Sequence, residues 1–218
     1  MQKSTIPYSI ISFFLALIVS SCTSLNVVKG YNPVALETTK FEVPYFSNPE
    51  MDYVYKANIT VYGNELSGIF IAKKINDTTH RVVFTTEFGN KLLDFEISET
   101  DFKINSIVEE LDRKILINTL KNDFRLLLKN SYVIKEQYDN PESKVCLTED
   151  AKTSNYLFIS KADNRLHKIV NASKRKERIN LFFTSENNIF ATKIVIQHYN
   201  IKLRIELNFL ETKLNEPS

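Results

Sequence analysis

The stretch Ile201-Lys-Leu-Arg-Ile-Glu-Leu-Asn-Phe209 decides the fold class, because apolar and polar residues alternate through it without a break. Successive side chains of a β-strand point to opposite faces, so all the apolar residues of this stretch would emerge on one side of a sheet. An α-helix, with its different period, would not separate them. The stretch therefore predicts a strand with one buried face and one wet face, as is typical of antiparallel sheets.

Noisier runs of the same kind recur along most of the chain. They cover residues 55–62, 66–75, 81–86, 92–98, 131–138, 145–148, 155–161, 165–171, 176–183 and 190–199. Short strands at close spacing, separated by turn segments, predict a single antiparallel meander.

One segment, residues 105–130, follows a helical period. Its apolar residues recur every three or four positions, and basic residues fill the other side. The apolar set is Ile107, Leu111, Ile115, Leu116, Leu120, Phe124, Leu127 and Leu128. Ser106 and Glu109 have the spacing of a capping box, which predicts that the helix begins there. We expect its apolar face to cover the sheet; a basic helix on a membrane surface is the alternative.

The N-terminus has the layout of a secretory signal. Lys3 precedes an uncharged apolar run over residues 10–19, which is too short to cross roughly 30 Å of hydrocarbon as a helix. The sequence Val19-Ser-Ser-Cys22 then resembles the bacterial lipobox, in which small residues precede a cysteine that accepts diacylglycerol. We expect cleavage before Cys22 and a stable lipid anchor on its thiol. An ordinary signal peptide that happens to contain a cysteine is the alternative.

The remainder is expected to form one domain behind a tether. Residues 1–21 are the predicted signal peptide, residues 22–49 a lipid-anchored tether rich in proline and polar residues, and residues 50–212 the domain. Position 23 holds Thr23 and not Asp, which by the sorting rules that such lipoproteins resemble argues against retention in the inner membrane. The expected location is the periplasmic side of the outer membrane.

The charge balance and the cysteine content argue against nucleic-acid binding and against an internal disulfide. The chain has 28 basic and 26 acidic residues, and removal of Lys3 with the signal leaves 27 against 26, a formal net charge of +1. A nearly neutral chain lacks the strong positive electrostatic potential that attracts nucleic acid. Once Cys22 is acylated, Cys146 has no partner for an internal disulfide, and its apolar strand predicts a small core residue.

The sequence contains no catalytic or metal-binding constellation, so no enzyme activity, cofactor or metal is expected. The histidines at His80, His167 and His198 lack the paired spacing of a zinc site and are expected at the surface. Asp94 and Glu96 occupy alternate strand positions and could face one another across a cleft. The same spacing is common wherever a strand has a wet face, and that interpretation is preferred.

The order of these features resembles the LolA and LolB group, the periplasmic lipoprotein carrier and the outer-membrane lipoprotein receptor. The similarity is best over residues 57–128, where Leu66-Ser-Gly-Ile-Phe-Ile-Ala-Lys73 is similar to the family's Ser/Gly strand and His80-Arg-Val-Val-Phe-Thr-Thr-Glu-Phe-Gly89 to its next strand and turn. Ile194-Val-Ile196 and Leu203-Arg-Ile-Glu-Leu207 are similar to its closing strands. The resemblance implies an α+β fold, an antiparallel incomplete β-barrel covered by one main amphipathic helix.

The resemblance also implies a function. It predicts a half-barrel cavity that binds lipid or lipoprotein acyl chains, a role in outer-membrane lipoprotein insertion, and a periplasmic carrier protein as a further partner. The alternating pattern fits a filled interior as well as an open one. Docking of a non-enzymatic lipoprotein onto an envelope protein complex is the alternative function.

Phe88 and Gly89 resemble the apolar residue and glycine that the receptor of this group carries on a protruding loop. Phe88 is therefore the candidate contact for the membrane or for an incoming acyl chain. Glu87 stands where the family pattern has proline, and the turn before Leu92 is short, both of which count against a long protrusion. A phenylalanine folded back into the core is the alternative.

Overall fold

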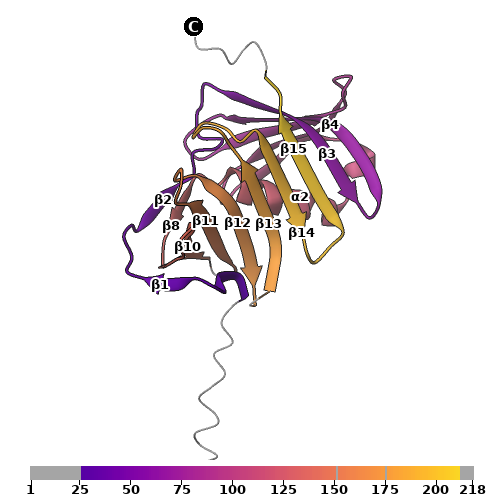
Figure 1. Ribbon diagram of the computed structural model, residues 1–218. Coiled ribbons are helices and arrows are strands. Elements are labelled where there is room, and N and C mark those ends of the chain that lie inside the picture. Colours follow the sequence, from indigo (N-terminus) through magenta and orange to yellow (C-terminus); the bar gives the residue numbers. More distant parts are fainter. Residues whose placement is uncertain (1–25, 151, 175, 212–218) are drawn as a thin grey trace, which may run out of the picture.

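The computed structural model describes residues 26–150, 152–174 and 176–211 of the 218-residue chain. The predicted signal peptide and Cys22 lie outside the described residues. Within them, a large antiparallel sheet curls around a single α-helix, α2 (Lys114–Leu128), as Figure 1 shows. The predicted α+β class and the incomplete barrel with one covering helix are confirmed, since the sheet is open and not closed on itself.

The strands are short and follow one another closely along the chain. In chain order they are β1 (Asn32–Val34), β2 (Lys40–Glu42), β3 (Asp52–Val61), β4 (Asn64–Lys74), β5 (His80–Thr85), β6 (Lys91–Ile97), β7 (Phe102–Ile107), β8 (Ser131–Val133), β9 (Glu136–Asp139), β10 (Ser143–Glu149), β11 (Ser154–Ser160), β12 (Leu166–Ser173), β13 (Lys176–Thr184), β14 (Lys193–His198) and β15 (Leu203–Phe209). Two 3-10 helices, η2 (Asn26–Val28) and η3 (Glu109–Leu111), complete the described elements.

The main sheet consists of two meanders and not one. Its order is β1-β9-β10-β11-β12-β13-β14-β15-β3-β4-β5-β6-β7, while β2 and β8 form a separate pair. The junction pairs β15 with β3 in antiparallel register, with Leu203 opposite Val61 and Leu207 opposite Ala57. The C-terminal strand therefore joins the two meanders, and β1 and β7 remain as the free edges of the sheet.

The alternation predicted for the last strand is confirmed. Leu203, Ile205 and Leu207 are buried against the helix side, while Arg204 points away from it. The inner faces of the other long strands follow the same rule, and their side chains form one hydrophobic core with α2. A smaller cluster on the outer face of β10, β11 and β12 includes Tyr156 and Phe158 and is covered by Val27, Val28 and Tyr31.

Part of the segment expected to be a tether belongs to the domain. Residues 32–34 and 40–42 form strands, and Val43, Tyr45 and Phe46 are buried in the core. Tyr45 stacks on Phe183 with ring centroids 5.0 Å apart. The prolines that indicated a tether lie in edge and connecting positions, where a missing N–H does no harm.

The predicted helix begins too early. Residues 102–107 form β7, which pairs with β6, so Ser106 is a strand residue and makes no capping box. The helix begins at Lys114, and its N-cap residue Arg113 makes no side-chain capping bond. Ile107 fits a helical period by its spacing, but its pairing with Leu93 of β6 outweighs this local pattern, and Leu111 lies in η3.

Candidate functional site

An apolar cavity lies between α2 and the inner face of the sheet. Its volume is about 70 Å³, and only hydrophobic side chains line it. The sheet contributes residues of β3, β4, β5, β6 and β15, and the helical segment contributes Leu111, Leu116, Leu120 and Phe124. Because strand side chains alternate, the polar residues of the same strands point to the outer face. The lining therefore offers contacts to hydrocarbon and no side-chain hydrogen bonds.

Small residues on the inner face make room for this cavity. Ala57 on β3 lines it, and Gly68 lies opposite Ala57 on β4. A Cβ atom at Gly68 would lie 2.1 Å from the carbonyl oxygen of Thr85 and 2.8 Å from the ring of Phe84. Glycine is thus required for the aromatic ring to lie flat against β4 beside the cavity.

The beginning of α2 closes the cavity only partly. Ile115, in the first turn, is 84% exposed although its spacing placed it on the predicted apolar face. Leu116 is half-buried, and Leu66 at the opposite wall is also partly exposed. The cavity therefore extends from the strand ends near Val61 and Leu203 toward the middle of the helix.

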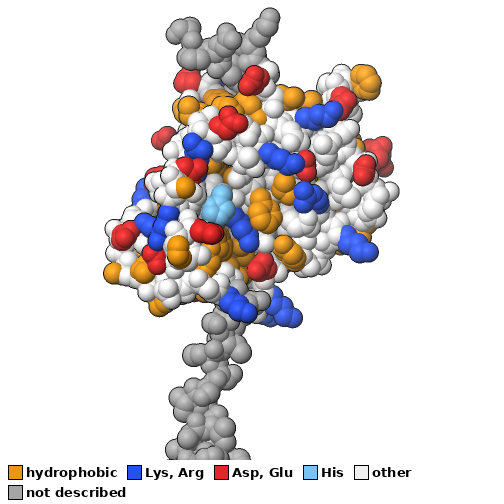
Figure 2. Space-filling view, viewed as in Figure 1, with side chains coloured by type: hydrophobic (Ala, Val, Ile, Leu, Met, Phe, Trp, Pro, Cys, Tyr) orange, Lys and Arg blue, Asp and Glu red, His pale blue; other side chains and the backbone are white. Residues whose placement is uncertain are grey.

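Phe88 lies at the tip of the turn between β5 and β6, and its side chain is 94% exposed. The N–H of Gly89 donates to the carbonyl of Thr86 at 3.0 Å, and Gly89 has φ +86°, a conformation that glycine adopts without strain. Figure 1 shows this hairpin projecting at the upper right, and Figure 2 shows hydrophobic surface at its end. The alternative of a phenylalanine folded into the core is wrong.

A buried carboxylate and imidazole join the helix to the sheet. His198 Nε2 lies 2.9 Å from Asp123 Oδ2, and both side chains are almost fully buried. Burial raises the pKa of the Asp123 carboxyl, and the bond to His198 opposes this rise. The sequence did contain a signal for this pair, since Asp123 falls inside the apolar stripe of the helix, between Leu120 and Phe124.

The expectation of surface histidines is wrong at two positions. His198 is buried as described, and His80 is buried with Nε2 2.8 Å from the backbone carbonyl of Phe46. Burial lowers the pKa of His80. His167 is half-buried and packs near the ring of Phe158. None of these side chains faces the apolar cavity lining.

Asp94 and Glu96 share the outer face of β6 and do not face one another across a cleft. Arg81 donates two hydrogen bonds to Asp94, at 2.9 and 2.6 Å, and Lys91 a third at 2.8 Å. The Arg81 guanidinium holds the pKa of Asp94 well below its usual range. Asp94 is nevertheless buried, because the stems of its cationic partners cover it. This network is a structural feature of the outer face.

The far end of α2 borders a polar cavity of about 660 Å³. Arg125, Lys129, Lys152 and Arg178 line it together with Glu99 and Asp150. Arg125 donates to the carbonyls of Ser98 and Thr100 and so fixes the β6–β7 turn to the helix. Within the described chain, no group of three or more His, Cys, Asp or Glu side chains is arranged to hold a metal ion. Cys146 is buried, as expected, and burial raises the pKa of its thiol.

Comparison with solved structures identifies the fold. A LolA superfamily protein from Nitrosomonas europaea aligns over 81% of this chain and 91% of its own, with a TM-score of 0.51 and 9% identity. A putative outer membrane lipoprotein-sorting protein domain from Vibrio parahaemolyticus aligns over 74% and 84%, with a TM-score of 0.43 and 9% identity. A DUF1329 family protein from Desulfovibrio piger aligns over 73% and 84%, with a TM-score of 0.42 and 10% identity.

The sequence itself matches no protein-family model and no curated protein. At such low identity, the likeness to the Nitrosomonas protein shows the fold alone. The chain thus has a LolA-like fold, an open antiparallel half-barrel around one helix. In the part of the chain that the structure describes, no helix has the length and apolar character needed to cross a membrane.

Proposed function

We propose that this protein is a lipid-anchored envelope lipoprotein that binds lipid or lipoprotein acyl chains between α2 and the inner face of the sheet. In this proposal the anchor is Cys22, the location is the periplasmic side of the outer membrane, and the role is in the insertion of lipoproteins there. The observation that carries the proposal is the exclusively apolar cavity under α2, where Leu116, Leu120 and Phe124 line it. The LolA-like fold supports it as an analogy between folds.

The size of the cavity defines what binding would require. Sites for ligands of drug-like size have volumes of roughly 300–1,000 Å³, whereas this cavity has about 70 Å³. A long acyl chain would therefore displace the first half of α2 outward. That half is suited to the movement, because Ile115 is exposed and the N-cap lacks a side-chain bond.

Extraction of the purified protein tests the proposal directly. The mature chain isolated from membranes should release diacyl or fatty-acyl lipid in excess of the lipid on Cys22 itself, as measured by mass spectrometry. A chain with Cys22→Ser provides the control, because any lipid that it carries must be bound non-covalently. Complete absence of lipid from both preparations, together with a stable protein partner, would favour docking onto an envelope complex.

The anchor is tested separately by metabolic labelling with a fatty acid. Cys22→Ser should give an exported precursor without label, since serine cannot form the thioether that precedes cleavage of the signal. Retention of label by the variant would remove Cys22 as the lipidation site.

Phe88 and Gly89 are proposed as the contact for the membrane or for the incoming acyl chain. A large apolar side chain that is almost fully exposed at a hairpin tip gains free energy when hydrocarbon covers it. Phe88→Glu should leave the unfolding midpoint unchanged and weaken flotation, with liposomes, of a Cys22→Ser chain expressed without residues 1–21. Unchanged flotation with an intact fold would exclude Phe88 from the mechanism.

One observation favours the alternative of docking onto a protein. Strand β7 is a free edge of the sheet and most of its residues are exposed, so its backbone could pair with a strand of another chain. A periplasmic carrier protein is a proposed partner both for acyl-chain binding and for docking onto a protein. Asn105→Pro in the middle of β7 should abolish such pairing, as measured by crosslinking, without any change in bound lipid.

A further inference from the structure

The turns at one rim of the sheet share features that suit a membrane surface. Antiparallel pairing places the β12–β13, β14–β15, β3–β4 and β5–β6 turns at the same strand ends. Backbone hydrogen bonds join neighbouring turns: the Tyr199 N–H donates to the carbonyl of Arg178, and the Tyr62 N–H donates to the carbonyl of Lys202, each at 2.9 Å. Tyr62 and Tyr199 are 66% and 58% exposed, and Phe88 follows on the same rim. Tyrosine is enriched where a protein meets the headgroup region of a bilayer.

Positive charge gathers at one end of this rim. Lys174, Lys176 and Arg178, which we name the basic turn, are all exposed, and the last two lie at the start of β13. Lys152 adjoins them, since the Ser173 hydroxyl donates to its carbonyl at 3.1 Å. None of these four side chains forms a salt bridge with a carboxylate of the described chain.

Two of the three nearby acidic groups are engaged elsewhere, and the third, Glu149 opposite Ser154, is exposed. Glu177 accepts a hydrogen bond from Asn180 at 3.0 Å and is partly buried. Asp150 lies 3.9 Å from the Lys129 ammonium at the edge of the polar cavity. The basic turn and Lys152 therefore present a surface with an excess of positive charge, although the whole chain is nearly neutral.

The described chain begins beside this end of the rim. Val27 and Val28 of η2 pack on the outer cluster that includes Val170 and Ala172 at the end of β12, and Lys29 follows them exposed. Figure 1 shows η2 at the lower end of the molecule next to the end of β12, and Figure 2 shows Lys and Arg side chains gathered there. Four residue steps separate Asn26 from Cys22, which span at most about 14 Å even when fully extended.

We propose that the basic turn, with Lys152 and Lys29, docks on anionic phospholipid headgroups, so that this rim of the half-barrel faces the membrane. The inference rests on the proposed lipid anchor, because a bilayer held within that short reach of η2 lies opposite the basic turn. Each Lys or Arg near an anionic surface contributes about 1 kcal/mol. The same rim carries the apolar cavity between Val61, Leu66 and Leu203, so an acyl chain would pass from the bilayer to the cavity without crossing water.

Vesicle binding of the unlipidated chain tests this surface without the anchor. A Cys22→Ser chain expressed without residues 1–21 should bind vesicles of phosphatidylcholine with phosphatidylglycerol more strongly than vesicles of phosphatidylcholine alone, and added salt should weaken this binding. Lys174→Gln, Lys176→Gln and Arg178→Gln together should reduce partitioning on the order of a hundredfold, with each residue contributing about fivefold.

The matched control removes the same number of charges at the opposite rim, with Lys73→Gln, Lys103→Gln and Lys161→Gln. It should retain nearly all binding, and both variants should keep the thermal midpoint of the parent chain, because every altered side chain is exposed. Equal loss in both triple variants, or no preference for anionic vesicles, would overturn the proposed surface. Acyl lipid that still co-purifies with the basic-turn variant would show that the cavity function stands independently of it.

Discussion

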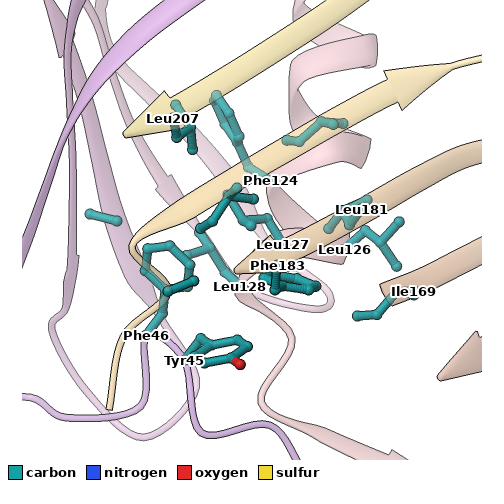
Figure 3. Packing of buried hydrophobic residues seen from close by; sticks show 14 of the residues in the cluster. Tyr45, Phe46, Phe124, Leu126, Leu127, Leu128, Ile169, Leu181, Phe183 and Leu207 are labelled. Carbon is teal, nitrogen blue, oxygen red and sulfur yellow. The ribbon is translucent and has the colours of Figure 1, made fainter. Parts of the chain in front are cut away.

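The two halves of α2 meet the sheet in different ways. The first half, with Ile115 and Leu116, lies over the apolar cavity and leaves one side chain almost fully in solvent. The second half is more deeply buried: Phe124 lines the inner end of the cavity and lies toward Leu207, and Figure 3 shows Leu127 and Leu128 near Tyr45, Phe46 and Phe183. The segment expected to be a tether supplies two of these aromatic rings.

The two halves therefore have different roles: the second half attaches the helix to the sheet, and the first half covers the proposed binding site. The second half is fixed by aromatic packing, by the Asp123–His198 bond and by the bonds of Arg125 to the β6–β7 turn. The first half reaches the sheet through Leu116 and Leu120, which line the cavity, and it makes none of these side-chain hydrogen bonds, so its displacement breaks fewer contacts. A helix anchored at one end and loosely packed at the other can admit a ligand without unfolding the domain.

The largest loss of stability is expected from a substitution in the second half of α2. Phe124→Ala should lower the free energy of unfolding by about 3–5 kcal/mol, because it removes a buried ring that packs on Phe70 at 5.4 Å. Leu116→Ala should have less than half that effect, since Leu116 is only half-buried whereas Phe124 is buried. Ile115→Ala, at an exposed position, serves as the control. Chemical denaturation of the three variants measures the difference, and equal losses for Phe124→Ala and Leu116→Ala would contradict it.

The next effect concerns the buried pair. His198→Ala leaves the Asp123 carboxyl buried without its partner and should destabilise the protein by at least about 3 kcal/mol at neutral pH. Without His198, burial alone acts on the Asp123 pKa and raises it. A raised pKa means that the variant regains stability at acid pH and loses it as the pH rises through the folded-state value.

The double variant Asp123→Asn with His198→Ala provides the control for this pH dependence. It should lack the additional slope, because it has no titrating carboxyl at the site. The free energies of unfolding are measured from acid to neutral pH. If His198→Ala shows the same pH dependence as the wild type, Asp123 is not the group that causes the additional slope.

A smaller loss is expected at Gly68. Gly68→Ala should destabilise the domain by about 1–3 kcal/mol, because its Cβ would overlap the Thr85 carbonyl and the Phe84 ring. Gly63→Ala at the β3–β4 turn meets no neighbouring atom but has φ +88°, so it separates backbone strain from steric overlap. If Phe84→Leu failed to relieve any of the loss in a double variant, overlap with the ring would not be its cause.

The sequence predicted features that depend on neighbouring positions along the chain. Strict alternation located β15, and the Phe88-Gly89 pair located the tip of a hairpin. The spacing of Leu120, Phe124 and Leu127 predicted the buried face of the helix. For the strand and the helix, the side-chain direction follows directly from the local backbone period, whereas Phe88 was placed by the family resemblance.

Features that depend on distant pairing could not be predicted in this way. The start of the helix was placed too early, because pairing with β6 draws residues 102–107 into the sheet. The place of Asp123 in the apolar stripe of the helix indicates a buried carboxylate, but its partner His198 lies 75 positions away along the chain, so no local spacing identifies that partner. Tyr45 and Phe46 were assigned to a tether because proline and polar residues surround them, although their partners lie across the fold.

A single tryptophan provides the most direct test of acyl-chain binding under the first half of α2. The chain contains no tryptophan, so fluorescence from Leu116→Trp or Phe183→Trp reports from one site only. Titration with a brominated fatty acid should quench the Leu116→Trp variant strongly and saturably. The Phe183→Trp variant, at the packed half beside Tyr45, should be little affected. Quenching of neither variant, or of the Phe183→Trp variant alone, would contradict a binding site beneath the loosely packed end of the helix.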